Sequence, residues 1–418
     1  MSDIGRIGQN MANTIPQATG KTNLKKSSEE TQVKDQVSLN QGGNSDAPLK
    51  KWTFMHYAAA DNNLLRFIKA DVNEMEVVGS TENMNLVVQL DEGRNCERYY
   101  LIQSDDTSKI TSPPLESLGP VNMADPKVLA DFIKFGVEKY PAQHYALVIG
   151  SHGAGWQGAV DDSSHRDFMS LPDIRKAVEM SGKDIDVLGF DCCLMATTEV
   201  AHEMNEAGVG YMVGSQQNEG GTGWNYTPLL TRKTLSEFNV ALSKRLNISP
   251  RQLAEKIIEH AEKEQYSLPT LSAVDLKMMK GVADATNLFS SQIILTDTPN
   301  DVLKDCIRKS EYFSNGLRDQ FHFAENVVNN DKISDDKLKT AAKGMMKAIQ
   351  NAVIAEQHSS RHPNAHGLSA ELPTYGGVRT GYKDVDYAKR TLWDEAIDKI
   401  YDKIQNAPEQ VKQPKAEA

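Results

Sequence analysis

The stretch that decides the fold is His144-Tyr-Ala-Leu-Val-Ile-Gly-Ser-His152-Gly153, an apolar run of strand length that ends at a histidine. A second run, Ile185-Asp-Val-Leu-Gly-Phe-Asp191-Cys192-Cys193, ends at an aspartate and two cysteines. In an open α/β sheet, the carboxyl ends of parallel strands meet at one edge, and ligands bind there. A histidine beside a cysteine is the minimum apparatus of a thiol nucleophile. We therefore predict that the two runs bring His152 next to a cysteine at this edge.

The composition is that of a globular protein with reduced thiols. The chain has 418 residues, 39% of them apolar and 25% charged, with a net charge of −11 and four cysteines. So few cysteines do not form a disulfide scaffold. Without a basic aromatic patch or a run of ~20 apolar residues, we expect no nucleic-acid or membrane partner. The first residues lack the apolar segment of a Sec-type signal peptide, which leaves localisation open between the cytoplasm and export by a non-Sec route such as a specialised secretion system.

The order of elements predicts an α/β protein with a mostly parallel sheet and helices on both faces. Residues 1–48 are polar and predict a disordered arm, either a solvated linker or a non-Sec export signal. We expect a core over 49–235, a mainly helical extension over 236–405 that completes it, and a flexible tail over 406–418. The expected strands are 52–59, 85–90, 98–103, 144–152, 185–191, 211–215, 268–274 and 367–372, and the expected helices are 63–78, 125–140, 172–180 and 195–207.

The residues around the two runs are those that thiol chemistry needs. A free thiol has a pKa near ~8.5, so an imidazole must take its proton or stabilise its thiolate. The N–H groups of Gly153 and Cys193 form a candidate oxyanion hole, the second because we expect a helix to start there. The alternatives are a structural histidine and a cysteine that packs as a small buried hydrophobe.

Longer stretches give a specific resemblance. His152-Gly-Ala-Gly-Trp156 and Asp191-Cys-Cys-Leu-Met195 resemble the two signature blocks of the clostripain family of cysteine peptidases, relatives of caspases, gingipains and legumains. Residues 57–64, 73–79, 118–125 and 223–226 resemble the same family. The resemblance implies a caspase-like fold, a monomer that acts on protein or peptide substrates, and a dyad of His152 and Cys193 that needs no third residue.

Two positions depart from the family pattern. The family usually has a small residue where this chain has Cys192. Because successive side chains of an extended segment point to opposite faces, we expect Cys193 to be the nucleophile and Cys192 to be buried. The resemblance also implies that Asp191 binds an Arg or Lys side chain before the cleaved bond, although an aspartate there can instead cap the next helix. A second acid is expected at Thr222, and Glu219 is its candidate substitute.

The resemblance raises two further expectations. Some family members cut themselves between the two blocks, and here the loop 161–167 offers Arg166, whereas Arg175 and Lys176 lie in an expected helix. Some relatives need calcium, but Asp105-Asp106 and Asp161-Asp162 lack the spacing of a calcium loop, so we expect no cofactor and no metal, with calcium as the alternative. Two other functions stay open, which are an exported effector or binding protein with little peptidase turnover and a ligase-like acyl transfer.

Overall fold

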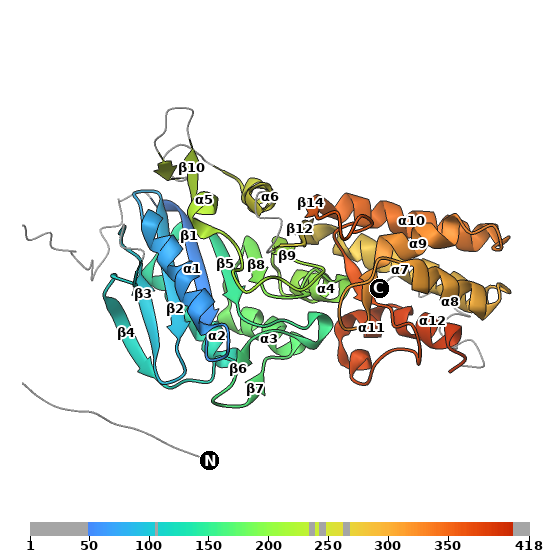
Figure 1. The fold of residues 1–418 in the computed structure, drawn as a ribbon, viewed down its shortest axis with the longest axis horizontal. Coiled ribbons are helices and arrows are strands. Elements are labelled where there is room, and N and C mark those ends of the chain that lie inside the picture. Colours follow the sequence, from blue (N-terminus) through green and yellow to red (C-terminus); the bar gives the residue numbers. More distant parts are fainter. Residues whose placement is uncertain (1–48, 105–107, 234–238, 242–247, 262–267, 404–418) are drawn as a thin grey trace, which may run out of the picture. The chain divides into compact units, whose positions relative to one another are not determined.

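The computed structural model describes residues 49–104, 108–233, 239–241, 248–261 and 268–403. The arm predicted over 1–48 and the tail predicted over 406–418 lie outside these ranges. A nine-stranded sheet forms the centre of the described part, and Figure 1 shows its strands following one another from β4 to β14. In sheet order the strands are β14 (Val353–His358), β12 (Thr270–Asp275), β9 (Tyr211–Gly214), β8 (Val187–Asp191), β5 (Ala142–Gly150), β1 (Lys50–Ala59), β2 (Met84–Asp91), β3 (Cys96–Tyr100) and β4 (Pro114–Gly119).

The middle of the sheet is parallel and both of its edges are antiparallel. Strands β9, β8, β5, β1 and β2 pair in parallel, while β12 and β14 on one side and β3 and β4 on the other run antiparallel to their neighbours. Strands β5 and β8 are direct neighbours, and their register pairs Gly150 with Asp191. The two apolar runs therefore end side by side, as their pattern predicts.

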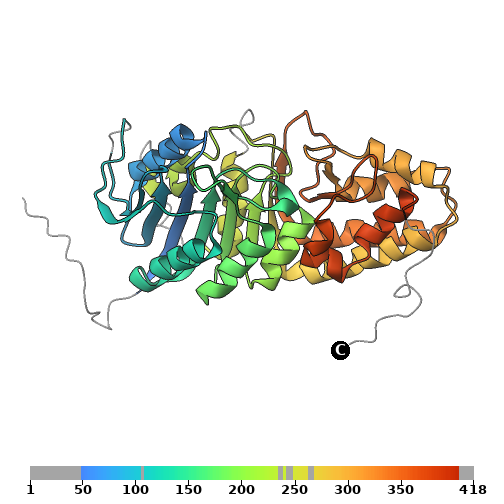
Figure 2. The same cartoon turned by 90° about the horizontal axis from the view of Figure 1, so that it is seen from below.

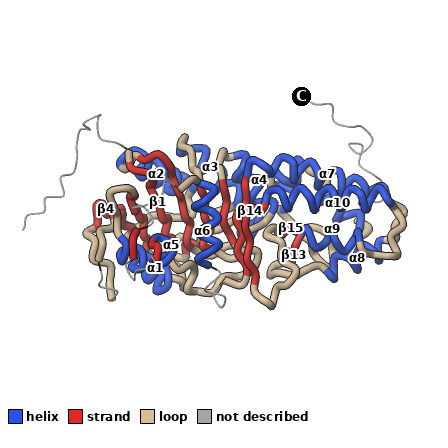
Figure 3. The backbone as a smooth tube through the Cα atoms, turned by 90° about the horizontal axis from the view of Figure 1, so that it is seen from above, coloured by secondary structure: helices blue, strands red, loops and turns tan. Residues whose placement is uncertain are grey.

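Helices cover both faces of the sheet (Figure 2). One face carries α2 (Pro126–Lys139), α3 (Leu171–Ser181) and α4 (Thr198–Glu206), and the other carries α1 (Leu65–Val78), α5 (Tyr226–Leu230) and α6 (Pro250–Ala261) (Figure 3). Alternate residues of β5 enter different cores, since Leu147 and Ile149 pack on the first face and Ala146 and Val148 on the second. Burial on both faces is the reason that this strand is an unbroken apolar run.

Helices α2, α3 and α4 begin where their sequences provide a cap. Asp125 accepts a hydrogen bond of 2.8 Å from the Lys127 N–H, and Pro126 occupies the first turn of α2, as predicted. Ser170 caps α3, and Thr197 caps α4. These caps fix the residues at which the three helices begin.

The rest of the described chain is mainly helical. Its helices are α7 (Met279–Leu295), α8 (Asn300–Lys309), α9 (Gln320–Val328), α10 (Asp336–Ala352), α11 (Asp386–Arg390) and α12 (Trp393–Ile400). Three small sheets pair β6 (Asp161–Asp162) with β7 (Asp167–Phe168), β10 (Thr231–Lys233) with β11 (Asn239–Ala241), and β13 (Leu317–Asp319) with β15 (Ser369–Glu371). Within the described ranges, no helix has the length and apolarity needed to span a membrane.

The short strands of the three small sheets were not predicted, apart from β15, and β15, β14 and β4 differ from the prediction in their own ways. The expected strand over 367–372 forms β15, but β15 pairs with β13 and not with the large sheet. Strand β14, inside a segment predicted to be helical, joins the large sheet directly after α10. Strand β4 was not predicted, because its residues Pro114–Gly119 are mostly exposed and show no apolar period. These strands exist because a partner strand lies beside them.

Candidate active site

Both expected reactive residues line one hollow at the carboxyl edge of the sheet. Its volume is about 110 Å³, and it lies where β5, β8 and β9 end. His152 follows β5 by two residues and Cys193 follows β8 by two residues. The lining residues, which include no Lys or Arg, are Leu64, Ile68, Asp71, Gly150, Ser151, His152, Asp191, Cys192, Cys193, Glu219, Gly220, Gly221 and Gly223.

The imidazole of His152 is held by a residue from another strand end. Its Nε2 atom lies 2.6 Å from Oδ1 of Asn63, in the loop between β1 and α1. Neighbouring Asn62 braces this loop, because its Nδ2 donates to the carbonyls of Ala59 and Asp161. With the Asn63 oxygen as acceptor, Nε2 carries the proton and Nδ1 is left with its lone pair. Sequence reasoning did not single out Asn63, although residues 57–64 belong to a stretch that resembles the family.

The two adjacent thiols have different surroundings. Cys192 is 2% exposed and its Sγ donates to the Ile149 carbonyl at 3.3 Å, so it packs as a core residue. Cys193 is partly exposed, and its Sγ lies 3.8 Å from the Glu219 carbonyl oxygen. Burial raises the pKa of both thiols, that of Cys192 well above its ordinary value. A substrate in the hollow therefore meets Cys193 as a neutral thiol, which has to lose its proton in order to attack.

Gly153 packs directly against the cysteine turn. A Cβ atom at this position would lie 2.4 Å from the Cys193 carbonyl oxygen, so only glycine permits the approach. Among the described residues, no carbonyl or side-chain oxygen accepts a hydrogen bond from the N–H of Gly153 or of Cys193. The N–H groups of Gly153 and Cys193 therefore remain candidates for an oxyanion hole.

The helix predicted to start at Met195, directly after the Cys193 turn, starts later. Helix α4 begins only at Thr198, and Leu194 occupies a turn with a φ of 68°. The chain between them stays extended because the Ala196 N–H donates to the Ser215 carbonyl and Thr197 pairs with Ser369. The Cys193 amide therefore belongs to a tight turn and not to a helix N-terminus.

Two of the expected acids line the hollow. Oδ2 of Asp191 accepts hydrogen bonds from Oη of Tyr226 at 2.8 Å and from the N–H of Trp224 at 3.2 Å. Asp191 is not a helix cap, because Thr197 caps α4. The carboxyl group of Glu219 is buried and lies beside that of Asp191 and the indole of Trp224. Thr222 is exposed and does not line the hollow.

These carboxyl groups hold protons more tightly than ordinary acids. Burial raises the pKa of Asp191, while contacts with Glu219, Tyr226 and the Trp224 N–H oppose the rise. Burial and the neighbouring Asp191 raise the pKa of Glu219 well above its ordinary value. Like charges so close together are not both ionised without a cation between them. In the absence of a cation, the hollow therefore carries less negative charge than the number of its acids suggests.

A third acid, Asp71, also lines the hollow and was missed by sequence reasoning. Helix α1 places it on one stripe with Leu64 and Ile68, at spacings of seven and three residues. Asp71 is 5% exposed. An acidic residue inside the apolar stripe of an amphipathic helix was the available signal, because acids are rarely buried without a partner.

The loop of the expected self-cleavage site is a hairpin and not a segment without strands. Strands β6 and β7 pair Asp161 with Phe168 and Asp162 with Asp167. Arg166 lies exposed in the turn between them, with a φ of 56°. Arg175 and Lys176 lie in α3, as predicted. The turn presents Arg166 to solvent, whereas the other two basic residues are part of a helix.

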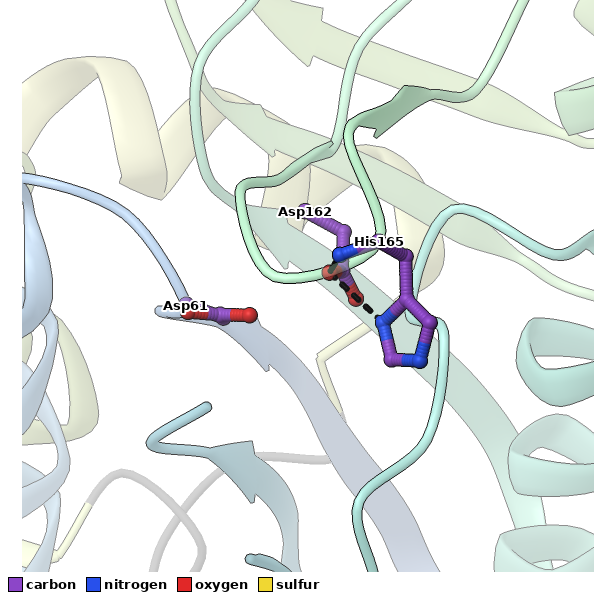
Figure 4. A group of neighbouring side chains, drawn as sticks. All are labelled: Asp61, Asp162 and His165. Atoms are coloured by element: carbon purple, nitrogen blue, oxygen red, sulfur yellow. Dashed lines mark hydrogen bonds and ion pairs between the residues drawn. The ribbon is translucent and has the colours of Figure 1, made fainter. Parts of the chain in front are cut away.

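One group of side chains in the described ranges has the composition of a metal site. Asp61, Asp162 and His165 gather between the end of β1 and the β6–β7 hairpin (Figure 4). The two oxygens of Asp162 already accept hydrogen bonds from the N–H groups of Met123 and His165, and Nδ1 of His165 lies 2.9 Å from the same carboxylate. This hydrogen bond to Asp162 raises the pKa of His165. In the structure these contacts form an aspartate–histidine pair that closes the hairpin. Asp105 and Asp106 lie outside the described residues.

Comparison with known proteins gives one family. The model of the clostripain family matches residues 56–399. The clostripain of Hathewaya histolytica is 22% identical in an alignment 426 residues long, which spans 84% of this chain and 80% of that protein. The family match over residues 56–399 includes both strand ends and all the residues that line the hollow.

Solved structures share the fold. A secreted C11 cysteine protease from Bacteroides thetaiotaomicron, in complex with an irreversible peptide inhibitor, superposes with a TM-score of 0.60 at 20% identity, over 85% of this chain and all of that one. An inactive zymogen C11 protease from Parabacteroides distasonis gives a TM-score of 0.60 at 20% identity, over 82% of this chain and 99% of that one. With a family match over most of its length, the chain belongs to the clostripain family of cysteine peptidases.

Proposed function

We propose that this chain is a cysteine endopeptidase in which Cys193 is the nucleophile and His152 carries the proton. The observation that carries the proposal is that both residues line one hollow at adjacent strand ends, while Cys192 is buried in the core. The inhibitor complex of the similar Bacteroides thetaiotaomicron protease supports peptide binding on this fold. A calcium ion has no part in the proposal.

The chemistry follows from these groups. The Cys193 thiol passes its proton to His152 as Sγ attacks the carbonyl carbon of the substrate's peptide bond. The N–H groups of Gly153 and Cys193 donate to the oxygen on which negative charge develops. The C–N bond then breaks, and the leaving amine takes the proton from His152. A water molecule attacks the carbonyl carbon of the resulting thioester and gives a proton to His152. The C–S bond then breaks, the Cys193 sulfur takes the proton back from His152, and the acid product leaves.

We further propose that the residue before the cleaved bond is Arg or Lys. Asp191 and Glu219 line the hollow beside Cys193, and no Lys or Arg lines it. A basic side chain relieves the repulsion between the two carboxyl groups and donates hydrogen bonds to both of them. Glu219 then replaces the acid that the family pattern leads one to expect at Thr222.

A peptide library and an active-site label test these proposals together. We expect cleavage after Arg or Lys, and labelling by an arginyl chloromethyl ketone that Cys193→Ala abolishes and Cys192→Ala retains. Labelling of Cys192, or an intact Cys193 protein that binds peptides without cutting them, would refute the dyad. Joining of peptides instead of hydrolysis would identify a ligase.

We also propose self-cleavage after Arg166. The exposed hairpin turn, which lies between the histidine and cysteine blocks, supports this site. The zymogen state of the similar Parabacteroides distasonis protein is consistent with a maturation step in such folds. Cleavage in a surface turn leaves both cores of the sheet intact.

A further inference from the structure

Asp71 belongs to the hollow by its position on α1. The helix turns Leu64, Ile68 and Asp71 toward the sheet edge, and all three line the hollow with Asp191 and Glu219. Asp191 ends β8 and Glu219 follows β9, so Asp71 is the acid supplied from the helical layer. Three carboxyl groups thus surround one space from three separate segments of the chain.

Asp71 has no partner within the described part of the chain. It makes no hydrogen bond or ion pair there, although it is buried, with only 5% of its surface exposed. Glu76, on the same helix, shows the usual arrangement of a buried acid, because it accepts hydrogen bonds from the N–H groups of Thr111 and Ser112. Burial, with Asp191 and Glu74 nearby, raises the pKa of Asp71 to about 10. A buried acid without a partner is costly, so its place on the wall of an open hollow points to a ligand that supplies the partner.

We propose that Asp71 is a specificity-determining residue, whose carboxylate binds the cationic side chain of the residue before the cleaved bond together with Asp191 and Glu219. The inference rests on the proposed preference for a basic residue and adds to it a third acid outside both signature blocks. A guanidinium carries five N–H donors in one plane and can serve carboxylates on more than one side. The arriving cation replaces the protons that the three acids share in the empty hollow.

The experiment uses two peptides that differ in one group. One has arginine before the cleaved bond and the other has citrulline, which has the same shape without the charge. The measured quantity is the ratio of kcat/KM for arginine to that for citrulline. We expect Asp71→Asn to lower this ratio by about 10-fold to 100-fold, because hydrogen bonds to charged groups are the strong ones. Asp131→Asn, which removes one charge from an exposed site on α2, leaves the ratio unchanged.

Two further measurements separate recognition from folding. The rate at which iodoacetamide alkylates Cys193 reports the state of the active site, and this reagent carries no basic side chain. The thermal midpoint of unfolding reports the stability of the fold. We expect Asp71→Asn to keep both, and to keep cleavage of the citrulline peptide. If Asp71→Asn does not fold, Asp71→Ser is measured in the same way.

The outcomes distinguish the two proposals. If the native protein discriminates against citrulline and Asp71→Asn discriminates equally well, Asp71 is not a specificity residue and the proposed function stands. If the native protein does not discriminate, the preference for a basic residue fails, and this inference fails with it. Equal loss on both peptides, together with slower alkylation, would give Asp71 a structural role and overturn the inference.

Discussion

The Nε2 atom of His152 lies 2.6 Å from the Oδ1 atom of Asn63, although the two residues are 89 positions apart in the chain. This hydrogen bond joins the loop after β1 to the segment after β5, two strands that pair in parallel. It directs the other ring nitrogen away from Asn63, so one side chain sets both the orientation of the imidazole and its tautomer.

Removing this acceptor is expected to slow the chemical step. Asn63→Ala should lower kcat by about 10-fold to 100-fold with little change in KM, because a misplaced catalytic group loses rate before it loses binding. Asn63→Asp keeps the acceptor and adds a charge that stabilises the imidazolium, so its pH profile of kcat should shift to higher pH. Steady-state kinetics across pH measures both. A kcat for Asn63→Ala within twofold of the native value would exclude a positioning role.

The two thiols are expected to respond oppositely to the same substitution. Cys193→Ala should abolish turnover and leave stability nearly unchanged. Cys192→Ala should retain turnover and lose roughly 1 kcal/mol of stability, because it removes a buried sulfur from the core. Peptide kinetics and thermal unfolding of both variants test this. Turnover by Cys193→Ala would show that the nucleophile has been assigned to the wrong thiol.

The binding of a basic substrate is expected to strengthen as pH rises. Burial raises the pKa of Asp71, Asp191 and Glu219, so the empty hollow retains protons that an arginine side chain must displace. Rising pH removes these protons and lowers the KM for the arginine peptide, by at most about tenfold per pH unit for each proton released. The KM for the citrulline peptide has no such dependence. Dividing the KM for arginine by the KM for citrulline therefore removes the effects that the titration of the thiol and the imidazole has on both peptides. A KM ratio that does not change with pH would contradict proton displacement.

His56 is expected to make the fold sensitive to acid. Its ring, in β1, is fully buried, and neither ring nitrogen has a hydrogen-bond partner in the described residues. Burial lowers its pKa to about 3, so between pH 6.5 and 3 the unfolded chain takes up a proton that the folded chain refuses. The free energy of unfolding is unaffected by protonation of His56 above about pH 6.5. As pH falls below this value, protonation of His56 in the unfolded chain lowers the free energy of unfolding, by about 2–3 kcal/mol at pH 4.5.

His56→Leu should therefore lose less stability between pH 7 and pH 4.5 than the native chain. His358→Leu, which removes an exposed histidine, serves as the matched control and should behave as the native chain does. Urea unfolding at the two pH values measures the difference. Equal acid sensitivity of His56→Leu and the native chain would show that His56 does not govern it.

Self-cleavage is expected to depend on Arg166 and on the active thiol. Purified native protein should contain two fragments that separate after Arg166, and Cys193→Ala should remain intact. Arg166→Gln should prevent the cut, whereas Lys176→Gln in α3 should not. Intact-mass spectrometry of the native protein and the three variants shows whether each one is cut and at which residue. Full activity in a native chain that remains uncut would exclude maturation at this turn.

The sequence alone determined the elements whose signal is local. The apolar runs of β5 and β8 show strand burial on both faces, and the residues after them show where the reactive groups emerge. The cap and proline of α2 mark its start, and the two signature blocks identify the family. Each of these signals lies within about a dozen consecutive residues, where backbone geometry and solvent exclusion act directly on the sequence.

Only the tertiary structure decided which distant groups share the hollow. Asp71 and Asn63 meet the reactive groups because α1 and the loop before it lie over the edge of β5 and β8. Strand β14 exists because β12 offers it a partner, although it follows α10 without a break and its segment was predicted to be helical. These contacts are stabilised by burial and strand pairing between segments far apart in the chain. The sequence pattern of a single segment therefore does not predict them.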